Sequence, residues 1–319
     1  MVLERVWDMK NKTNIMVTGC AGFIGSHFTD LLSKKYNVVG IDLMTYAAKK
    51  ENMSQFQDKI TFYKADIADF NTIERIVKDH KIDWIINFAA ETHVDNSINS
   101  SEKFLRSNIA GVHSLLEVCR LHNCGIFQIS TDEVYGSIKD GSFVESDKLN
   151  PRNPYSATKA AAEHLITSYN NTYGVTYKMV RMSNNFGPRQ NKEKFIPTIL
   201  RSLGENKKIP VYGDGKNIRD WFYVKDCAKC ILSVFENDFV NETYNLTLVN
   251  EKENIEVVDT ILRILQKNLA DHVEFVRDRL GHDFRYSIDN NKFINNIGVV
   301  SETDFTKAIT ETIEYYEKQ

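Results

Sequence analysis

The chain has 319 residues and a formal net charge of -3, and 42% of its residues are hydrophobic while 26% are charged. These values are close to those of globular proteins, so they exclude disordered and fibrous classes and leave no electrostatic signature of binding to nucleic acid or to an anionic membrane. No apolar run reaches the roughly 20 residues that a membrane-spanning helix needs. Residues 1–13 are polar and lack the apolar core of a signal peptide, so we expect an N-terminal extension on a cytoplasmic protein.

From residue 14 to residue 182, short apolar and β-branched runs alternate with longer stretches of helical periodicity. Such alternation is typical of a parallel sheet with helices on both faces. We therefore predict an α/β, doubly wound first domain over residues 14–182. Its strands are predicted at 15–18, 37–41, 61–63, 84–88, 126–130 and 176–182, and its helices at 23–35, 72–80, 101–122 and 154–173.

Beyond residue 182 this periodicity is lost, and turn signals such as Gly187-Pro188 and Gly213-Asp214-Gly215 become frequent. We expect residues 183–218 and 248–319 to form a smaller mixed α/β lobe, with a final amphipathic helix at 303–316. Residues 219–247 are expected to return to the first domain.

The chain has five cysteines, an odd number without an export signal, which predicts reduced thiols. Cys227 and Cys230 form a CxxC pattern, but neither a second ligand pair for zinc nor a strained turn for redox chemistry is visible near them. Because the stretch 224–235 has the periodicity of an amphipathic helix, we interpret both thiols as buried core residues. We predict no metal site.

A Gly-x-x-Gly-x-x-Gly segment follows the first predicted strand and opens the first predicted helix, and its glycines are Gly19, Gly22 and Gly25. In this context glycines let the backbone approach a pyrophosphate at the helix N-terminus; a purely structural turn is the alternative. Asp42 ends the second strand, where a carboxylate binds the adenosine ribose and repels a 2′-phosphate, so NAD is favoured over NADP. Asp66 and Ile67 follow the third strand, where they could flank the adenine. The alternative is that they are purely structural, Asp66 as a strand-end carboxylate and Ile67 as a core residue.

Tyr155 and Lys159 are four residues apart in a predicted helix and so share one face. A free tyrosine has a pKa of about 10, and a neighbouring ammonium group favours the phenolate, which makes proton transfer feasible nearer neutral pH. Thr131 ends a predicted strand, and its hydroxyl can hold a substrate hydroxyl beside the phenol. Asp132 and Glu133 come directly after Thr131. One of these acids could donate a proton and the other accept one; the alternative is that both are solvated side chains of a turn without a chemical role.

Motifs over nearly the whole chain, from about residue 14 to residue 315, carry a family resemblance. They lie at residues 17–25, 88–95, 130–136, 153–159, 181–188, 211–215, 219–221 and 281–283. In these motifs the chain resembles nucleotide-sugar enzymes of the extended short-chain dehydrogenase/reductases, and within them the dTDP-glucose 4,6-dehydratase family. Only the triplet at 131–133 separates close relatives: similar epimerases have small residues in place of Asp132 and Glu133, whereas UDP-glucuronate decarboxylases and GDP-mannose 4,6-dehydratases have Thr-Ser-Glu.

The resemblance implies a Rossmann-type fold and a hydro-lyase that converts an NDP-glucose into its 4-keto-6-deoxy derivative. The sugar is oxidised at C4 while Tyr155 takes the O4 proton, Glu133 removes the C5 proton, Asp132 protonates the departing C6 hydroxyl, and a hydride returns to C6. The NAD is regenerated in each turnover, so it is expected to be held tightly.

The resemblance also assigns individual positions. Those that match NAD-contacting positions are Phe23, Ile24, Asp42, Asp66, Ile67, Ala89, Ser107, Tyr155, Lys159 and Asn185. Those that match nucleotide-sugar positions are Thr131, Asn184, Lys194, Phe195, Val211, Tyr212, Arg219, Asn254, Arg279, His282 and Tyr286. Arg219 and Arg279 are expected to bind the diphosphate, because a guanidinium group binds phosphate bidentately; a solvated surface charge is the alternative.

A homodimer is implied as well, in which the helices at 101–122 and 154–173 pair with their copies in a four-helix bundle. We expect Leu115, Leu116 and Val118 on the first helix and Leu165 on the second to supply its apolar surface.

The nucleotide-binding lobe departs from the family pattern at Leu280, at Phe284 and at residues 247–249, so both a thymidine and a uridine nucleotide are candidates; the one methyl group that separates their bases is worth only about 1 kcal/mol. Two other functions compete with the dehydratase. A UDP-sugar 4-epimerase or UDP-glucuronate decarboxylase is disfavoured by Asp132 and Glu133. A non-catalytic NAD-binding regulator would not need the intact Thr131, Tyr155 and Lys159.

Overall fold

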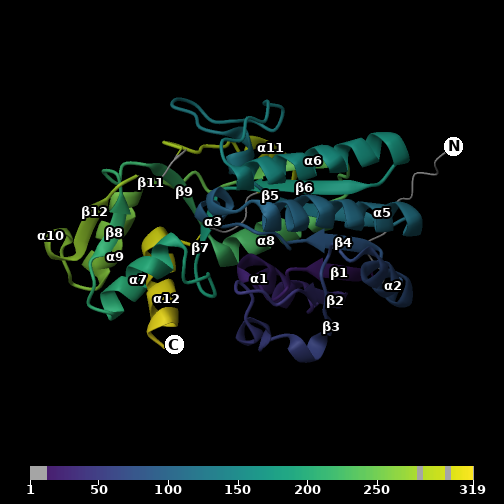
Figure 1. Ribbon diagram of the computed structural model, residues 1–319, viewed down its shortest axis with the longest axis horizontal. Coiled ribbons are helices and arrows are strands. Elements are labelled where there is room, and N and C mark those ends of the chain that lie inside the picture. The colour runs from purple at the N-terminus through teal and green to yellow at the C-terminus, as the bar shows by residue number, and fades with distance from the viewer. Residues whose placement is uncertain (1–12, 279–282, 299–302, 319) are drawn as a thin grey trace.

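A seven-stranded parallel sheet forms the centre of the molecule (Figure 1). The computed structural model describes residues 13–278, 283–298 and 303–318. The strand order is β10-β6-β5-β4-β1-β2-β3, which is that of a doubly wound fold, and the order reverses between β1 and β4. The strands are β1 (Asn14–Thr18), β2 (Asn37–Asp42), β3 (Thr61–Lys64), β4 (Trp84–Asn87), β5 (Gly125–Thr131), β6 (Tyr177–Met182) and β10 (Glu242–Leu246).

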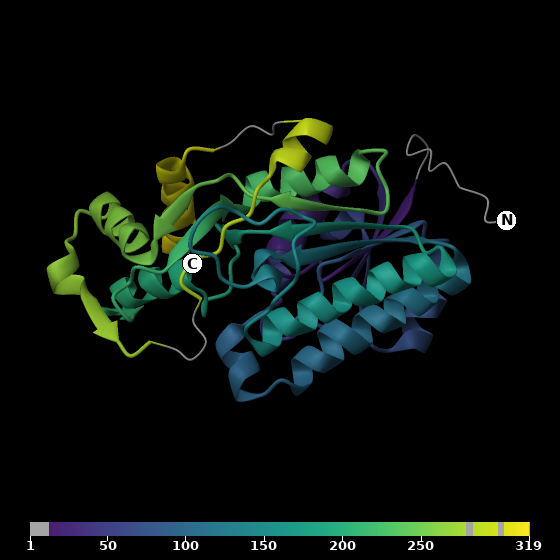
Figure 2. The ribbon, with the colours of Figure 1, turned by 90° about the horizontal axis from the view of Figure 1, so that it is seen from above.

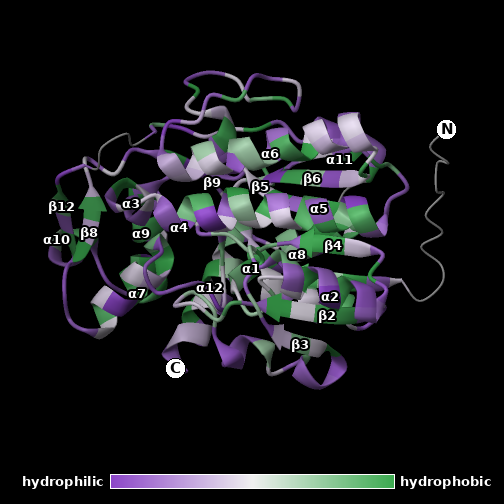
Figure 3. Ribbon diagram, turned by 45° about the vertical axis from the view of Figure 1, so that its right-hand side comes forward, coloured by the Kyte–Doolittle hydropathy of each residue, from purple (hydrophilic) through white to green (hydrophobic). Residues whose placement is uncertain are grey.

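Helices cover both faces of this sheet (Figure 2). One face is covered by α1 (Phe23–Leu32) and α8 (Val224–Glu236), and the other by α2 (Phe70–His80), α5 (Val112–His122) and α6 (Pro154–Tyr173). β4 is buried along its whole length and begins with the apolar run Trp84-Ile85-Ile86; Figure 3 shows hydrophobic colouring over much of this strand. Because the six predicted strands and four predicted helices mostly form where the pattern placed them, the predicted α/β class is confirmed.

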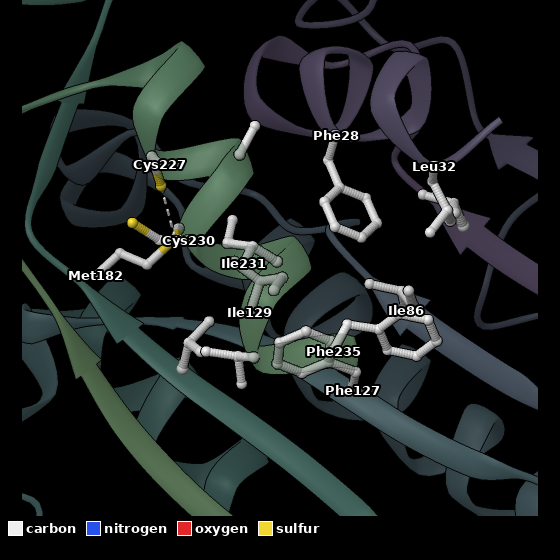
Figure 4. Packing of buried hydrophobic residues seen from close by; sticks show 14 of the residues in the cluster. Phe28, Leu32, Ile86, Phe127, Ile129, Met182, Cys227, Cys230, Ile231 and Phe235 are labelled. Atoms are coloured by element: carbon white, nitrogen blue, oxygen red, sulfur yellow. Dashed lines mark hydrogen bonds between the residues drawn. The ribbon is translucent and has the colours of Figure 1, made fainter. Parts of the chain in front are cut away.

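The interface under α8 is a dry core of aromatic and aliphatic side chains (Figure 4). Phe235 of α8 stacks on Phe127 of β5, with ring centroids 6.2 Å apart. Cys227 and Cys230 of the same helix are buried there, and burial raises the pKa of Cys230 to about 12. Both thiols are therefore core residues, as predicted.

The helix predicted over residues 101–122 is interrupted. α4 (Glu102–Phe104) continues into a π-helical segment (Leu105–Gly111) and then into α5. Asn108 is buried in this segment, where its Oδ1 accepts from the Glu91 backbone N–H at 2.9 Å and its Nδ2 donates to Thr158 Oγ1 at 2.9 Å. Such segments are frequent at functional sites, and hydropathy periodicity alone does not distinguish them from an α-helix.

The prediction that Leu115, Leu116 and Val118 lie on an outer, partner-facing surface is wrong. All three are fully buried in the core between α5 and the sheet, and Leu165 packs against the same core while half-buried. The large apolar side chains that α5 and α6 expose are Leu121, which is 50% exposed, and Tyr173, which is 54% exposed.

The smaller lobe has two short sheets and its own core. The sheet β11-β9-β7 contains β7 (Asn184–Phe186), β9 (Ile218–Tyr223) and β11 (Glu251–Glu253), and β8 (Ile209–Tyr212) pairs with β12 (Val273–Val276). Its helices are α7 (Phe195–Gly204), α9 (Asn254–Ile264), α10 (Leu269–His272) and α12 (Phe305–Glu317). Residues 219–247 were expected to return to the large sheet, but the return begins only after β9, which pairs within this lobe. From there α8 packs on α1, and β10 pairs in parallel with β6.

Short helical elements complete the fold. α3 (Val94–Asn99) precedes α4, α11 (Asn291–Asn296) lies beside β10, and 3₁₀ turns span Lys50–Met53, Gln57–Lys59 and Asp132–Tyr135. Within the described ranges, no helix has both the length and the apolar character required to cross a bilayer.

Candidate active site

A cavity of about 650 Å³ opens at the carboxyl ends of the central strands. Its walls come from the segments that follow β1, β2, β3 and β4, together with α6 and residues 190–194. Doubly wound proteins bind their ligands at this edge, where the strand order reverses. The volume is within the range of ligand sites, about 300–1,000 Å³.

The glycine segment after β1 forms a tight floor under this cavity. Gly19 has a left-handed φ of +70°, and a Cβ there would lie 2.7 Å from the Ala89 backbone nitrogen. A Cβ on Gly25 would lie 2.2 Å from the carbonyl oxygen of Gly19. Only glycine fits these two positions, and α1 begins at Phe23 with its N-terminus at the cavity. This arrangement suits an anionic group such as a pyrophosphate.

Asp42 ends β2 and is held rigidly at the wall of the cavity. Its Oδ2 accepts from the Ala21 N–H at 3.0 Å, and its Oδ1 accepts from the Met44 N–H at 2.8 Å. A carboxylate oxygen has a second lone pair, so each can still accept a hydrogen bond from a ribose hydroxyl. Burial raises the pKa of Asp42, and the two N–H donors oppose that shift.

Most of the predicted cofactor residues meet at this one cavity. Asp66 Oδ2 accepts two hydrogen bonds from Arg106, one from Nε at 3.0 Å and one from Nη2 at 2.7 Å. Asn185, in β7, is not part of the lining. The predicted residues that do line the cavity are Gly19, Gly22, Phe23, Ile24, Gly25, Asp42, Asp66, Ile67, Ala89, Ser107, Tyr155 and Lys159.

Other lining residues escaped the sequence prediction. Tyr46 donates its hydroxyl proton to Glu91 Oε2 at 3.3 Å, and Asn191 donates to the Tyr46 carbonyl at 3.5 Å. Gln190 also lines the cavity. These residues follow β2, β4 and β7, and no local pattern in the sequence indicates that the three segments meet.

Tyr155 and Lys159 are presented by the first turns of α6. Asn153 caps the helix and Pro154 occupies its first position, a start that suits the chain because proline needs no N–H partner there. Lys159 is buried, its Nζ donates to the Ile129 carbonyl at 2.6 Å, and burial lowers its pKa to about 8.

The pKa of Tyr155 differs from the sequence expectation. The expectation considered only the Lys159 cation, but in the structure burial and the negative charge of Glu133 raise the pKa of the Tyr155 phenol, while a hydrogen bond with Thr131 opposes this. Asp132 and Glu133, whose charges both raise this pKa, are far from Tyr155 in sequence, so the i, i+4 spacing of Tyr155 and Lys159 does not predict their effect.

Asp132 and Glu133 occupy a 3₁₀ turn directly after β5. The Thr131 hydroxyl donates to Asp132 Oδ1 at 3.2 Å and accepts from the Glu133 N–H at 3.3 Å. Asp132 is 3% exposed, and burial and the charge of Glu133 raise its pKa well above the usual carboxyl range. Its Oδ2 is buried without a hydrogen-bond partner among the described residues. Burial and the neighbouring carboxyl group therefore both favour the protonated, neutral form of Asp132.

The residues expected to hold the nucleotide sugar are spread over the smaller lobe. Arg219 does not present an open fork to a diphosphate in this arrangement: Nη1 donates to the carbonyls of Ile218 and Phe284, and Nη2 donates to that of Asp283. Its guanidinium lies 4.3 Å from the ring centroid of Tyr286, whose hydroxyl is 3.5 Å from Glu133 Oε2. Tyr286 therefore lies between the turn Asp132–Tyr135 and this lobe.

The other predicted sugar-side residues have these positions. Lys194 donates to the Thr92 carbonyl at 3.0 Å and lines the cavity. Phe195 packs on Trp221, with centroids 5.9 Å apart. Val211 is buried and Tyr212 is 40% exposed in β8, Asn184 is in β7, and Asn254 begins α9. Arg279 and His282 lie outside the described residues.

Metal coordination is not indicated in the part of the chain that the structure describes. Within it, no group of three or more His, Cys, Asp or Glu side chains could hold a metal ion.

Comparison with known proteins agrees with this geometry. The family model described as GDP-mannose 4,6 dehydratase matches residues 16–312. The chain belongs to this 4,6-dehydratase family. A curated member, the low-salt glycan biosynthesis protein Agl12 of Haloferax volcanii, is 42% identical over 309 residues, which are 95% of this chain and 98% of that protein.

Solved structures of the family have the same fold. That of dTDP-glucose 4,6-dehydratase from Bacillus anthracis, in complex with NAD, is 38% identical and has a TM-score of 0.89, covering 96% of this chain and 97% of that one. The resemblance seen in the sequence motifs is thus confirmed. UDP-glucose 4-epimerase from Thermotoga maritima, with UDP-glucose, is 26% identical with a TM-score of 0.88, covering 96% and 99%. Since epimerases share the fold, the reaction has to be argued from the site.

Proposed function

We propose that this protein is an NAD-dependent nucleotide-sugar 4,6-dehydratase that acts on dTDP-glucose or UDP-glucose. The observation that carries the proposal is the buried Asp132, whose surroundings favour the protonated form, next to Glu133 on the turn that faces Tyr155. Elimination of water across C5 and C6 needs an acid for the leaving hydroxyl and a base for the C5 proton, and a 4-epimerase needs neither.

The residues at the cavity fit NAD. The glycine floor leaves room for a pyrophosphate, and Asp42 is fixed where an adenosine ribose would be held. When bound, NAD supplies a reversible acceptor of two electrons, so the net reaction is redox-neutral. The residues that would hold it are those of the glycine segment together with Asp42, Asp66, Ile67, Ala89 and Ser107.

The protein's own residues divide the proton transfers among them. Tyr155 takes the O4 proton when C4 is oxidised, for which it must be a phenolate; the raised pKa opposes this form, and the Lys159 ammonium group on the same helix face, fixed by the Ile129 carbonyl, favours it. The resulting C4 ketone makes the C5 hydrogen acidic. Glu133 takes that proton, and Asp132 gives one to the C6 hydroxyl, which leaves as water. Reduction at C6 and return of a proton to C5 complete the 4-keto-6-deoxy product.

The test is incubation of the purified protein with dTDP-glucose, and in parallel with UDP-glucose and GDP-mannose, followed by the product mass. Loss of one water with formation of a 4-keto sugar is the expected result. An unchanged mass with an inverted C4 centre would make the protein an epimerase, and no conversion of any of these sugars would favour a regulator. dTDP-glucose and UDP-glucose differ in the methyl group of the base and in the ribose 2′-hydroxyl, and the methyl group alone should change kcat/KM by less than about tenfold.

The assignment of each part of the chain is also a proposal. Residues 14–182, with α8 and β10, would bind NAD, while residues 183–218 and 248–319 would bind the nucleotide sugar. The cytosol is the proposed location.

Replacing Asp42 by alanine should weaken NAD retention and reduce the preference for NAD over NADP. The substitution removes the ribose acceptor and the charge that repels a 2′-phosphate, so NAD should bind about tenfold more weakly. The measurement is the NAD content of the purified protein, with dissociation constants for both cofactors. Asp79→Ala, at an exposed position of α2, is the control. Unchanged NAD content in Asp42→Ala would show that Asp42 does not bind the ribose.

We further propose a homodimer through the outer faces of α5 and α6. Light scattering at micromolar concentration should give twice the chain mass of 36.7 kDa. Ser168→Arg places a charge at an exposed position of α6 and should favour the monomer, whereas Ser54→Arg, exposed beside a 3₁₀ turn, should not. A single-chain mass for the parent protein would rule out the dimer.

A further inference from the structure

The N-cap of α6 makes two contacts at once. Asn153 Oδ1 accepts from the Ser156 N–H at 2.9 Å, and the Ser156 hydroxyl accepts in turn from the Asn153 N–H at 3.3 Å, which closes a capping box. Asn153 Nδ2 donates to Glu133 Oε2 at 3.2 Å. One contact needs an acceptor and the other needs a donor, so together they fix the orientation of the amide.

Helix capping alone does not account for the amide nitrogen. Serine, threonine and aspartate cap helices about as well as asparagine. Aspartate, however, has no donor for a carboxylate, and serine and threonine have a single polar atom on a shorter side chain. Asparagine is the residue that can cap α6 and still donate to Glu133.

The surroundings of Glu133 contain other groups that bear on its charge. Asp132 precedes it in the turn and Tyr155 faces it from α6. From the smaller lobe comes Tyr286, whose hydroxyl donates to Asp283 Oδ2 at 2.7 Å and is 3.5 Å from Glu133 Oε2; behind it lies Arg219. Among the described residues, the Asn153 amide is the donor nearest to the Glu133 carboxylate.

We propose that Asn153 is a positioning residue that holds the Glu133 carboxylate in the orientation needed for removal of the C5 proton. This inference rests on the proposed function, in which Glu133 is the base. The contact also links the catalytic turn after β5 to the start of α6, so the base and Tyr155 are placed by the same helix end. The Asn153 amide donates to Oε2, and among the described residues Oε1 has no hydrogen-bond donor, so Oε1 is the oxygen more open to the C5 proton.

Two variants of Asn153 keep the cap and change the contact. Asn153→Ser removes the donor, and because a hydrogen bond to a charged group stabilises the ionised form, kcat should fall about tenfold and the acidic limb of the pH–rate profile should move up by about one pH unit. Asn153→Asp puts a second carboxyl group against Glu133 and should move that limb further. The exchange of the C5 hydrogen with solvent should slow in both variants, while KM and the melting temperature stay near those of the parent.

The matched control is Asn268→Asp. Asn268 caps α10 with its Oδ1 and donates to Asp271 Oδ2 at 2.8 Å, so the same change is made at a similar cap outside the cavity. The control should leave the pH profile unchanged. If both Asn153 variants kept the parent's pH profile and C5 exchange, whatever their stability, Asn153 would have only a capping role. If instead Glu133→Gln retained C5 exchange and dehydration, the proposed function of Glu133 would be wrong, a result separate from the failure of the positioning role.

Discussion

Replacement of Tyr155 by phenylalanine should reduce 4-keto product formation by about 10²–10⁴-fold, because it removes the group that takes the O4 proton. The ring itself should stay in place, since it packs edge-on against Phe104 with centroids 6.4 Å apart. Oxidation at C4 is the first step, so none of the later steps can proceed without it. The measurements are product formation and the near-ultraviolet absorbance of reduced nicotinamide after substrate is added, and neither should rise in the variant.

A matched tyrosine lies further along the same helix. Tyr169 donates its hydroxyl proton to Glu117 Oε1 at 2.6 Å, away from the cavity, so Tyr169→Phe should retain full activity. Reduced nicotinamide that formed in Tyr155→Phe at the parent's rate would exclude Tyr155 as the base at O4.

Asp132→Asn should separate oxidation from elimination. The amide keeps the size of a side chain that is only 3% exposed, but it cannot donate an acidic proton to the C6 hydroxyl. Elimination should slow by about 10²–10⁴-fold while C4 is still oxidised, so reduced nicotinamide and a 4-keto-glucose intermediate should accumulate on the enzyme. Glu133→Gln is the contrasting variant, because it should also slow the exchange of the C5 hydrogen with solvent.

The pH dependence of Asp132 gives a second readout. Burial and the neighbouring Glu133 raise its folded pKa and so favour the protonated form, and activity should be lost as the pH rises through that pKa. The asparagine variant should lack this alkaline loss. Normal turnover in Asp132→Asn, or slow turnover without reduced nicotinamide, would contradict the acid role, and the dehydratase assignment would then rest on family membership. Single rates are less informative than this pattern, since residues that act as a unit are not additive.

Sequence reasoning was sufficient for features set by local periodicity and by short motifs. The strands β1, β2, β5 and β6, the helix α6 and the glycine segment form where the pattern predicted them, because a buried parallel strand and a capped helix are each specified within a few residues. The cavity likewise gathers residues that follow strand ends, as the topology of a doubly wound sheet requires.

Features that depend on distant contacts could not be read in this way. The π-helical segment depends on Asn108 bonding to Glu91 and Thr158, residues that are near only in the folded chain. The buried face of α5 differs from the prediction because Leu115 and Leu116 pack against the sheet and not against a partner subunit. The raised pKa of Tyr155 likewise has its causes in the folded chain, namely burial and then the charge of Glu133, which lies 22 residues earlier.

The route of the chain between the lobes has a consequence for biosynthesis. When residue 182 leaves the ribosome, six strands of the large sheet have been made, but β6 is still an open edge and Phe127 still lacks the helix that covers it. The covering helix α8 and the edge strand β10 are synthesised only after β7 and β9 of the other lobe. The large sheet therefore cannot be completed before Leu246 has been made. A gene cut at residue 182, where the periodicity changes, should therefore yield a fragment that aggregates. A tag or a permuted terminus should be better tolerated in a surface loop outside the segment between β6 and β10.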